Sequence, residues 1–203
     1  KLNGMTVGAV ANCTEVHDEE GKVAEKFDAA LTARGCEKAS DFIRFCDAFE
    51  IPVLSITNVT GFKASMCCER RLAKALAHMT SAFASATCPK VNLIVGDAFG
   101  SAYVTMNSKS IGADLVYAWP DTKIGMMDAE LAAKIMYADA SADVLAEKAK
   151  EYEQLQSNVL TAARRGYVDL IIEPADTRKY LVAAFEMLYT KCVSVPDKKH
   201  GTK

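Results

Sequence analysis

The amino-acid sequence predicts one α/β domain. Three observations support this fold class: a length of 203 residues, a composition that is 50% hydrophobic and 25% charged, and the alternation of short apolar runs with helical patterns. A chain of this length can bury a core as a single unit. Strand-sized apolar segments that alternate with amphipathic helical segments are typical of α/β folds.

The first half of the chain is expected to begin with a strand at residues 5–12. The charged segment at residues 15–26, with Gly21 near its centre, is interpreted as a loop. Apolar side chains then recur at steps of three and four, which is typical of one face of a helix. This stripe consists of Ala39, Phe42, Ile43, Cys46 and Phe49. Pro52 ends the helical pattern, and the β-branched run at residues 53–57 indicates the next strand.

The second half continues the alternation. A helical stripe is formed by Leu72, Leu76, Met79 and Phe83, and it closes before Pro89. The apolar run at residues 91–95 predicts a strand buried on both faces, and a helix is expected to start near Gly100. We then expect a strand at residues 115–119, a helical stretch at 141–165, a strand at 168–172, and a last helix marked by Leu181, Ala184, Phe185 and Leu188.

Charge and hydropathy argue against two kinds of partner. The formal net charge is −2, the sequence pI is about 6.0, and no basic tract precedes residues 198–200, so nucleic acid is not expected as a ligand. No apolar run approaches the roughly 18–20 residues that a membrane span needs. The first ten residues lack the features of a secretory signal. Because the chain begins without Met and enters a strand almost at once, we expect a fragment or a processed product.

The cysteines indicate a reducing, cytoplasmic environment. There are seven, an odd number, and no two of them form a C-x-x-C motif. A disulfide framework would require an even set with regular spacing. Cys67 and Cys68 are adjacent and lack a second pair of ligands at zinc spacing, so we expect no metal site.

The segment from Gly96 to Tyr103 is the best candidate in the sequence for part of a catalytic site. It follows a buried strand, precedes a helix, and has small residues where the backbone must turn. The first N–H groups of a helix lack intrahelical partners, and two of them pointing into a pocket can stabilise an oxyanion. The same string also fits a tight strand-to-helix turn in which Gly100 serves close packing.

Several ordered motifs carry a resemblance to a known family. They are residues 7–12, 42–52, 86–91, 98–103, 106–109, 112–114, 118–120, 165–169, 174–178 and 198–201. In these motifs the chain resembles the C-terminal domain of the carboxyltransferase subunits of propionyl-CoA and methylmalonyl-CoA carboxylases and of the sodium-pumping decarboxylases. The match extends over nearly the whole chain.

The resemblance implies a crotonase-like (ClpP/crotonase) spiral of β-β-α units, with a C-terminal carboxyltransferase domain at residues 1–195 and a polar tail at 196–203. It implies a biotin-dependent enzyme that transfers a carboxyl group between biotin and a short-chain acyl-CoA. An N-terminal carboxyltransferase domain would hold the coenzyme A thioester, and a biotin carboxyl carrier domain would deliver carboxybiotin. We also expect a homo-oligomer, in which the two kinds of domain meet across subunits.

Carried onto this sequence, the oxyanion donors would be the backbone N–H groups of Ser101 and Ala102, with Gly100 permitting the turn. In the family reaction the biotin enolate itself takes the α-proton of the acyl-CoA, so no side chain need act as general base. Contacts with biotin would come from Phe99, Tyr103, Gly61 and Phe62; for Phe99 and Tyr103, packing in the core is the alternative. Val104 would line the acyl pocket or, alternatively, belong to the core.

Three departures from the family pattern leave other functions open. Ser101 and Asp128 stand where glycine is usual, and residues 63–66 replace a Pro-Gly loop. A free-standing CoA-thioester hydratase or isomerase would need paired carboxylates, for which Asp128 and Glu130 are the candidates; Asp128 as a helix N-cap with Glu130 in the first turn is the simpler explanation of both. A non-catalytic paralogue that scaffolds a carboxylase assembly is the third interpretation. His78 lies off its helix's apolar stripe and is interpreted as a surface or rim residue.

Overall fold

The architecture is a parallel sheet flanked by helices. The computed structural model describes residues 1–194, so the predicted tail from residue 196, the end of the predicted domain at 195 and the motif at 198–201 lie outside the described residues. The main sheet has the strand order β1 (Gly8–Ala11), β5 (Val53–Val59), β7 (Lys90–Phe99), β8 (Leu115–Ala118) and β10 (Leu170–Ile171). Every neighbouring pair is parallel, which confirms the predicted α/β class.

Strand β7 is the centre of this sheet. Its first half pairs with β5 on one side and β8 on the other, and its last three residues pair with the short β9 (Lys123–Gly125). The predicted strand at residues 91–95 is therefore confirmed, and it continues further than expected, to Phe99. A strand with partners on both sides and helices on both faces is expected to be apolar throughout. Accordingly, Val91, Ile94 and Ala98 have no exposed surface.

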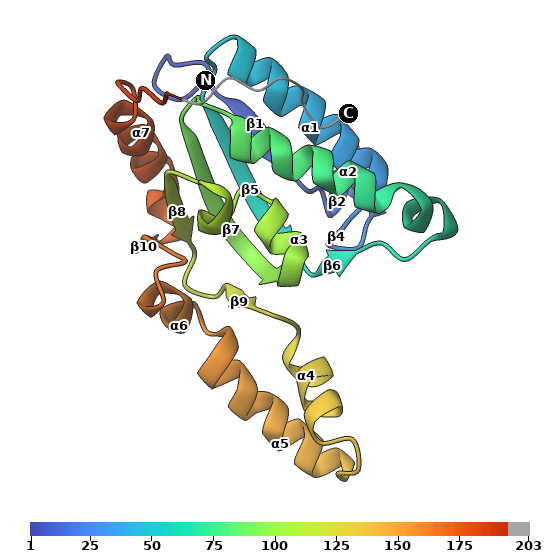
Figure 1. Ribbon diagram of the computed structural model, residues 1–203. Helices are drawn as coiled ribbons and strands as arrows, with labels where there is room; N and C mark the ends of the chain where they lie inside the picture. Colours follow the sequence, from blue (N-terminus) through green and yellow to red (C-terminus); the bar gives the residue numbers. More distant parts are fainter. Residues whose placement is uncertain (195–203) are drawn as a thin grey trace.

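Helices cover both faces of the sheet, as Figure 1 shows. Helices α1 (Ala33–Ala48) and α2 (Met66–Ser85) lie together on one face, and α7 (Thr177–Met187) lies on the other. The N-cap side chains of Thr32 and Ser65 start α1 and α2. The core between sheet and helices includes Ile43 from α1 and Met79 and Phe83 from α2. The predicted stripes at residues 72–83 and in the last helix are thus confirmed by burial or partial burial.

The stripe predicted for α1 is only half right. Ile43 and Cys46 are buried, but Phe42 and Phe49 are exposed by 39% and 66%. The helix begins at Ala33, earlier than predicted, and its buried face runs through Ala33, Cys36, Ser40, Ile43 and Cys46. Cys46 and the edge of the Phe42 ring lie against Gly8 of β1, so Phe42 is partly exposed at the margin of the sheet, and Phe49 at the end of the helix is mostly exposed.

The charged segment at residues 15–26 is not a loop, which corrects that prediction. Strands β2 (Glu15–His17) and β3 (Val23–Lys26) pair in antiparallel fashion, and the turn between them contains Gly21 at φ +79°. Both strands are exposed throughout, so no hydrophobic face marked them in the sequence. A further two-stranded sheet joins β4 (Ala30–Leu31) to β6 (Gly61–Phe62).

A helical arm extends from the sheet after β9, as Figure 1 shows in yellow and orange. It contains α4 (Ala129–Met136), α5 (Ala142–Tyr152), a π-helical turn (Glu153–Ser157) and α6 (Val159–Arg164). The helical stretch predicted at residues 141–165 is therefore interrupted, and Asn158 caps α6 with its side chain. The short α3 (Gly100–Thr105) and the 3-10 turns Lys109–Ile111 and Pro174–Asp176 complete the helices.

Two further properties bear on the environment of the protein. Between residues 1 and 194, no helix combines the length and the apolar character that crossing a bilayer requires. All seven cysteines are free thiols; Cys13, Cys67 and Cys192 are exposed and the other four are buried.

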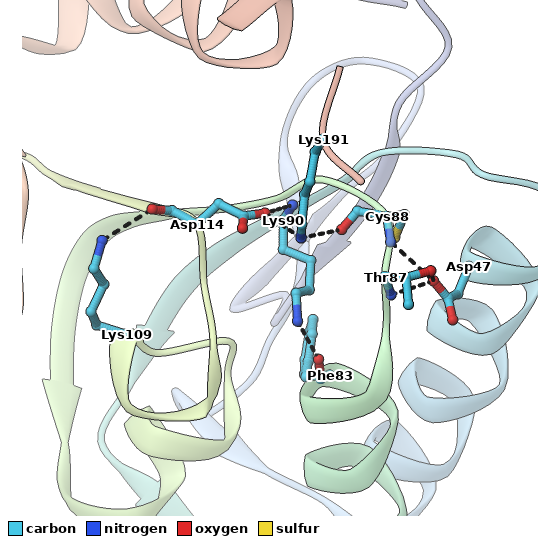
Figure 2. Close-up of polar contacts among 8 residues, drawn as sticks. All are labelled: Asp47, Phe83, Thr87, Cys88, Lys90, Lys109, Asp114 and Lys191. Carbon is cyan, nitrogen blue, oxygen red and sulfur yellow. Dashed lines mark hydrogen bonds and ion pairs between the residues drawn. The ribbon is translucent and has the colours of Figure 1, made fainter. Parts of the chain in front are cut away.

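An ion-pair cluster fastens the last described segment to the beginning of β7 and β8 (Figure 2). The Asp114 carboxylate accepts a bond from the Lys191 ammonium and another from the Lys90 backbone N–H, both at 2.8 Å. Lys191 also donates to the Cys88 carbonyl. The Lys90 side chain is buried and donates to the Phe83 carbonyl, and burial, followed by the charge of Lys191, lowers the pKa of Lys90.

The substitution Asp114→Ala is expected to lower the free energy of unfolding by about 2–3 kcal/mol, because it removes the carboxylate that pairs with the Lys191 ammonium and accepts the Lys90 N–H. Urea unfolding followed by circular dichroism measures the change. The matched control is Glu20→Ala, which removes an equally short ion pair to Lys22 whose partners are mostly exposed. That pair should contribute less than about 0.5 kcal/mol. Equal losses in both variants would contradict the prediction.

Candidate active site

Three polar residues meet where the strands β1, β5 and β7 end. The Asn58 backbone N–H donates to the Asn12 side-chain oxygen at 3.0 Å, and the Asn12 amide donates back to the Asn58 carbonyl. The Asp97 N–H donates to the Asn58 side-chain oxygen at 3.1 Å. A Cβ at Gly96 would lie 2.5 Å from that oxygen, so only glycine allows this approach. Ligands of open parallel sheets bind at this carboxyl edge.

The turn from β7 into α3 places two backbone donors at the same edge. Gly100 has φ +60°, in the left-handed region, and a Cβ there would lie 3.0 Å from the Met126 carbonyl oxygen. The N–H groups of Ser101 and Ala102, in the first turn of α3, donate to no group among residues 1–194. The turn therefore presents two unpaired amide hydrogens beside a residue that has to be glycine.

The other end of α3 is held by a buried polar network. The side-chain amide of Asn107 donates to the Ser55 hydroxyl at 3.0 Å. The backbone of Asn107 has φ +57°, in the left-handed region. The hydroxyls of Ser55 and Thr57 both donate to the Asn92 side-chain oxygen, at 3.2 and 2.8 Å. Because Ser55, Thr57, Asn92 and Asn107 are all buried, these bonds form in a medium of low dielectric constant. The network fixes α3 relative to β5 and β7.

Charged side chains from the arm surround the start of this turn. Asp97 pairs in register with Lys123 of β9, and Lys123 forms an ion pair with Glu153 at 3.0 Å. Burial raises the pKa of the half-buried Asp97, and so do Asp128 and Glu153, whereas Lys123 opposes the shift. The hydrogen bond to Glu153 raises the pKa of Lys123. The Asp97 carboxyl group is therefore protonated more easily than an ordinary aspartate.

The side chains expected to contact biotin or the acyl chain lie in several places. Phe99 and Tyr103 are buried, as the alternative of core packing predicts, and burial raises the pKa of Tyr103 to about 12. Gly61 and Phe62 form β6 and are half-buried. Val104 is half-buried on α3. Their contacts with biotin or with an acyl chain stay predictions.

At the three departures from the family pattern, one side chain is exposed and two cap helices. The Ser101 side chain is exposed, so it takes no space in the core. Ser65, within the altered segment at 63–66, caps α2. Asp128 caps α4 by accepting bonds from the N–H groups of Glu130 and Leu131, which confirms the N-cap interpretation. His78 is half-buried at the rim of α2.

Sequence reasoning missed Asn12, Asn58 and Asp97 as members of this edge. One signal was available: each lies at or next to the end of a predicted strand, and the ends of parallel strands meet at one edge. What the spacing could not show is that Asn58 contacts both neighbours, because the partners are 46 and 39 residues away in the chain.

Comparison with known proteins gives one consistent family. The family model of the carboxyl transferase domain matches residues 1–202. The chain is 46% identical over 179 residues to the putative propionyl-CoA carboxylase beta chain of Bacillus subtilis, covering 85% of this chain and 35% of that protein. It is 36% identical over 208 residues to the methylmalonyl-CoA carboxyltransferase 12S subunit of Propionibacterium freudenreichii subsp. shermanii, covering 99% and 38%.

Solved structures agree with this result. The hexameric transcarboxylase 12S, crystallised with methylmalonyl-coenzyme A and methylmalonic acid, superposes with a TM-score of 0.88 at 36% identity, over 99% of this chain and 38% of that one. The beta subunit of P. aeruginosa geranyl-CoA carboxylase, with a TM-score of 0.77 at 23% identity, shows the fold alone. The crotonase-like fold is confirmed. The chain spans little more than a third of the length of these relatives.

The substitution Gly100→Ala is expected to lower the free energy of unfolding by about 1–2 kcal/mol, because alanine is strained at positive φ and its Cβ meets the Met126 carbonyl. Thermal and urea unfolding measure the loss. Gly61→Ala is the matched control, since a Cβ there has no heavy atom within 4 Å among the described residues. An unchanged Gly100→Ala protein would show that the turn is not constrained.

The substitution Asp97→Asn is expected to stabilise the fold at neutral pH. A carboxyl group whose folded pKa is raised binds its proton more tightly in the folded state, so ionisation above the unfolded value of 3.8 costs stability. The neutral amide removes that cost. The gain should shrink as the pH falls below the usual carboxyl range, which urea unfolding at a series of values from about pH 3 to about pH 7 tests. A gain that is independent of pH would contradict the assignment.

Proposed function

The chain belongs to the carboxyl transferase domain family, and from this we propose that it supports carboxyl transfer between biotin and a short-chain acyl-CoA, as the C-terminal, biotin-side half of the enzyme. The observation that carries the proposal is the pair of unpaired N–H groups at Ser101 and Ala102, beside Gly100 at the end of β7. Two fixed donors of this kind stabilise negative charge on an oxygen in the transition state.

Two free backbone donors suit the ureido oxygen of a biotin ring, and the N–H groups of Ser101 and Ala102 would donate to that oxygen where negative charge develops. When bound, biotin supplies the carboxyl group that is transferred. The exposed position of Ser101 leaves the two donors accessible from outside the domain. Gly61 and Phe62 of β6 are the further biotin contacts we propose, and Val104 is the proposed contact with the acyl chain.

Exposed apolar side chains, from Met126 near the donors to α4 on the arm, support a second domain as partner. Met126, whose carbonyl touches the Gly100 turn, has a side chain that is 77% exposed, and Leu131, Ile135 and Met136 of α4 are each more than half exposed. Apolar surfaces of this kind mark protein interfaces. We propose that an N-terminal carboxyltransferase domain, from a second copy in a homo-oligomer, packs here and holds the acyl-CoA.

Two other parts of the proposal concern delivery and location. Carboxybiotin would arrive on a biotin carboxyl carrier domain, which would present the ring to the N–H groups of Ser101 and Ala102. Seven free thiols in one chain are typical of a reducing compartment, which supports a cytoplasmic location.

The decisive variant is Ser101→Pro in the enzyme that contains both carboxyltransferase domains, because proline removes one amide donor while the first turn of a helix tolerates it. The kcat for biocytin-dependent conversion of methylmalonyl-CoA to propionyl-CoA is expected to fall about 10²–10³-fold. The matched control, Ser101→Ala, keeps the N–H and should stay near the wild-type rate. Thermal unfolding of both variants verifies the fold. Equal activity in two folded variants would refute the proposal.

A further inference from the structure

A cavity that does not reach the Ser101 and Ala102 donors lies at the N-terminal ends of α1 and α2, and Asn12 of the strand-end edge described above is part of its lining. It has a volume of about 980 Å³ and is bordered by β1, β4 and the first turns of the two helices, which lie side by side in Figure 1. None of residues 99–104 lines it. Its charged lining is mostly cationic: the groups are Arg34, Lys38, Lys63, Arg71 and one carboxylate, Asp28. The cavity therefore attracts small anionic molecules.

Two buried thiols from different helices share this cavity. Cys36 is in the first turn of α1 and Cys68 is in the first turn of α2, and both belong to the core between these helices. One residue further along α1, Glu37 accepts two bonds from Arg71 of α2, at 2.8 and 3.0 Å, which holds the two helices together at this level. The exposed Cys67 also lines the cavity.

The surroundings of Cys68 favour its thiolate. Cys68 lies in the first turn of α2, where its backbone N–H donates to the Ser65 hydroxyl at 3.2 Å. Hydrogen bonding by the Ser65 side chain and by the Ala33 backbone, together with the charge of Lys63, lowers the pKa of Cys68 against the opposing effect of burial. Thiolates are stabilised in the same way at other helix N-termini.

The neighbouring Cys36 has the opposite preference. Burial raises its pKa to about 11, and the nearby Cys68 and Glu37 add to the shift. At pH 7 a thiol with this pKa is thiolate in about one molecule in 10⁴. The two sulfurs of the cavity are therefore not equivalent, and reactivity toward electrophilic sulfur is concentrated on Cys68.

We propose that Cys68 is a thiol-modification site that exchanges with anionic low-molecular-weight disulfides entering this cavity. The Cys68 thiolate attacks one sulfur of the disulfide, a new S–S bond forms, and the old one breaks. The Cys68 sulfur is oxidised, and the departing sulfur leaves as a thiolate that takes a proton from water. Cys36 provides a protonated thiol beside the adduct. The inference does not depend on the carboxyl transfer proposed above.

The test is a reaction of the folded full-length chain with oxidised glutathione, an anionic disulfide, followed by acid quenching and peptide mapping by mass spectrometry. The first adduct is expected on Cys68, ahead of the more exposed Cys13, Cys67 and Cys192. Cystamine, a cationic disulfide, is expected to modify Cys68 about tenfold more slowly, because it is repelled by the cationic lining. Later conversion to a Cys36–Cys68 disulfide would also support the site, since it begins with the same attack.

Three variants sharpen the result. Cys68→Ser should abolish the early adduct, whereas the adjacent, more exposed Cys67→Ser should leave it unchanged. Lys63→Gln should slow the reaction of Cys68 with oxidised glutathione and so reduce the difference in rate between oxidised glutathione and cystamine. The proposal is overturned if Cys67, Cys13 or Cys192 reacts first while Cys68 stays unmodified in the wild-type chain, or if both disulfides react with Cys68 at the same rate. The wild-type map decides the matter even if Cys68→Ser fails to fold.

Discussion

The pairing of β7 on both sides is the constraint on which the rest of the structure depends. Its register with β5 and β8 fixes where the strand ends, and the buried bonds of Asn92 to Ser55 and Thr57 tie the same strands together through side chains. The strand therefore places Gly100 against the Met126 carbonyl. The direction of the Ser101 and Ala102 amides is a consequence of sheet geometry, and no side chain of the turn is needed to aim them.

Local pattern predicted the elements whose signal lies within one segment. The apolar run at 91–95 and the small residues around Gly100 indicated a buried strand followed by a helix, and both are present. Prediction failed where burial depends on distant partners. Phe42 and Phe49 looked like core residues of α1, yet Phe42 lies at the margin of the sheet against Gly8, and Phe49 lies at the exposed end of the helix. The exposed hairpin β2–β3 has no apolar face, so hydropathy could not reveal it.

The candidate site likewise has a part that one segment of sequence predicts and a part that depends on distant segments. Its backbone donors follow from a short stretch of sequence, whereas the Asn12–Asn58–Asp97 edge and the pair of thiols at Cys36 and Cys68 each join segments that are far apart in the chain. Polar residues at strand ends marked the edge weakly. Nothing in the spacing of the cysteines indicated that two helix starts would converge on one sulfur, because that depends on α1 and α2 running in the same direction over the same sheet face.

Two backbone amides are strong catalysts only where water is excluded, because hydration weakens a hydrogen bond to a developing charge. In this chain Ser101 faces solvent, and the apolar side chains of Met126 near the turn and of Leu131 and Ile135 on α4 are exposed as well. A single domain that packs over this region would exclude water from the backbone donors and from the apolar side chains together. The apolar surface would then supply the binding energy of the interface, and the same contact would lower the dielectric constant around the amides. Assembly and catalysis would thus have a common physical cause in the arm that follows β9.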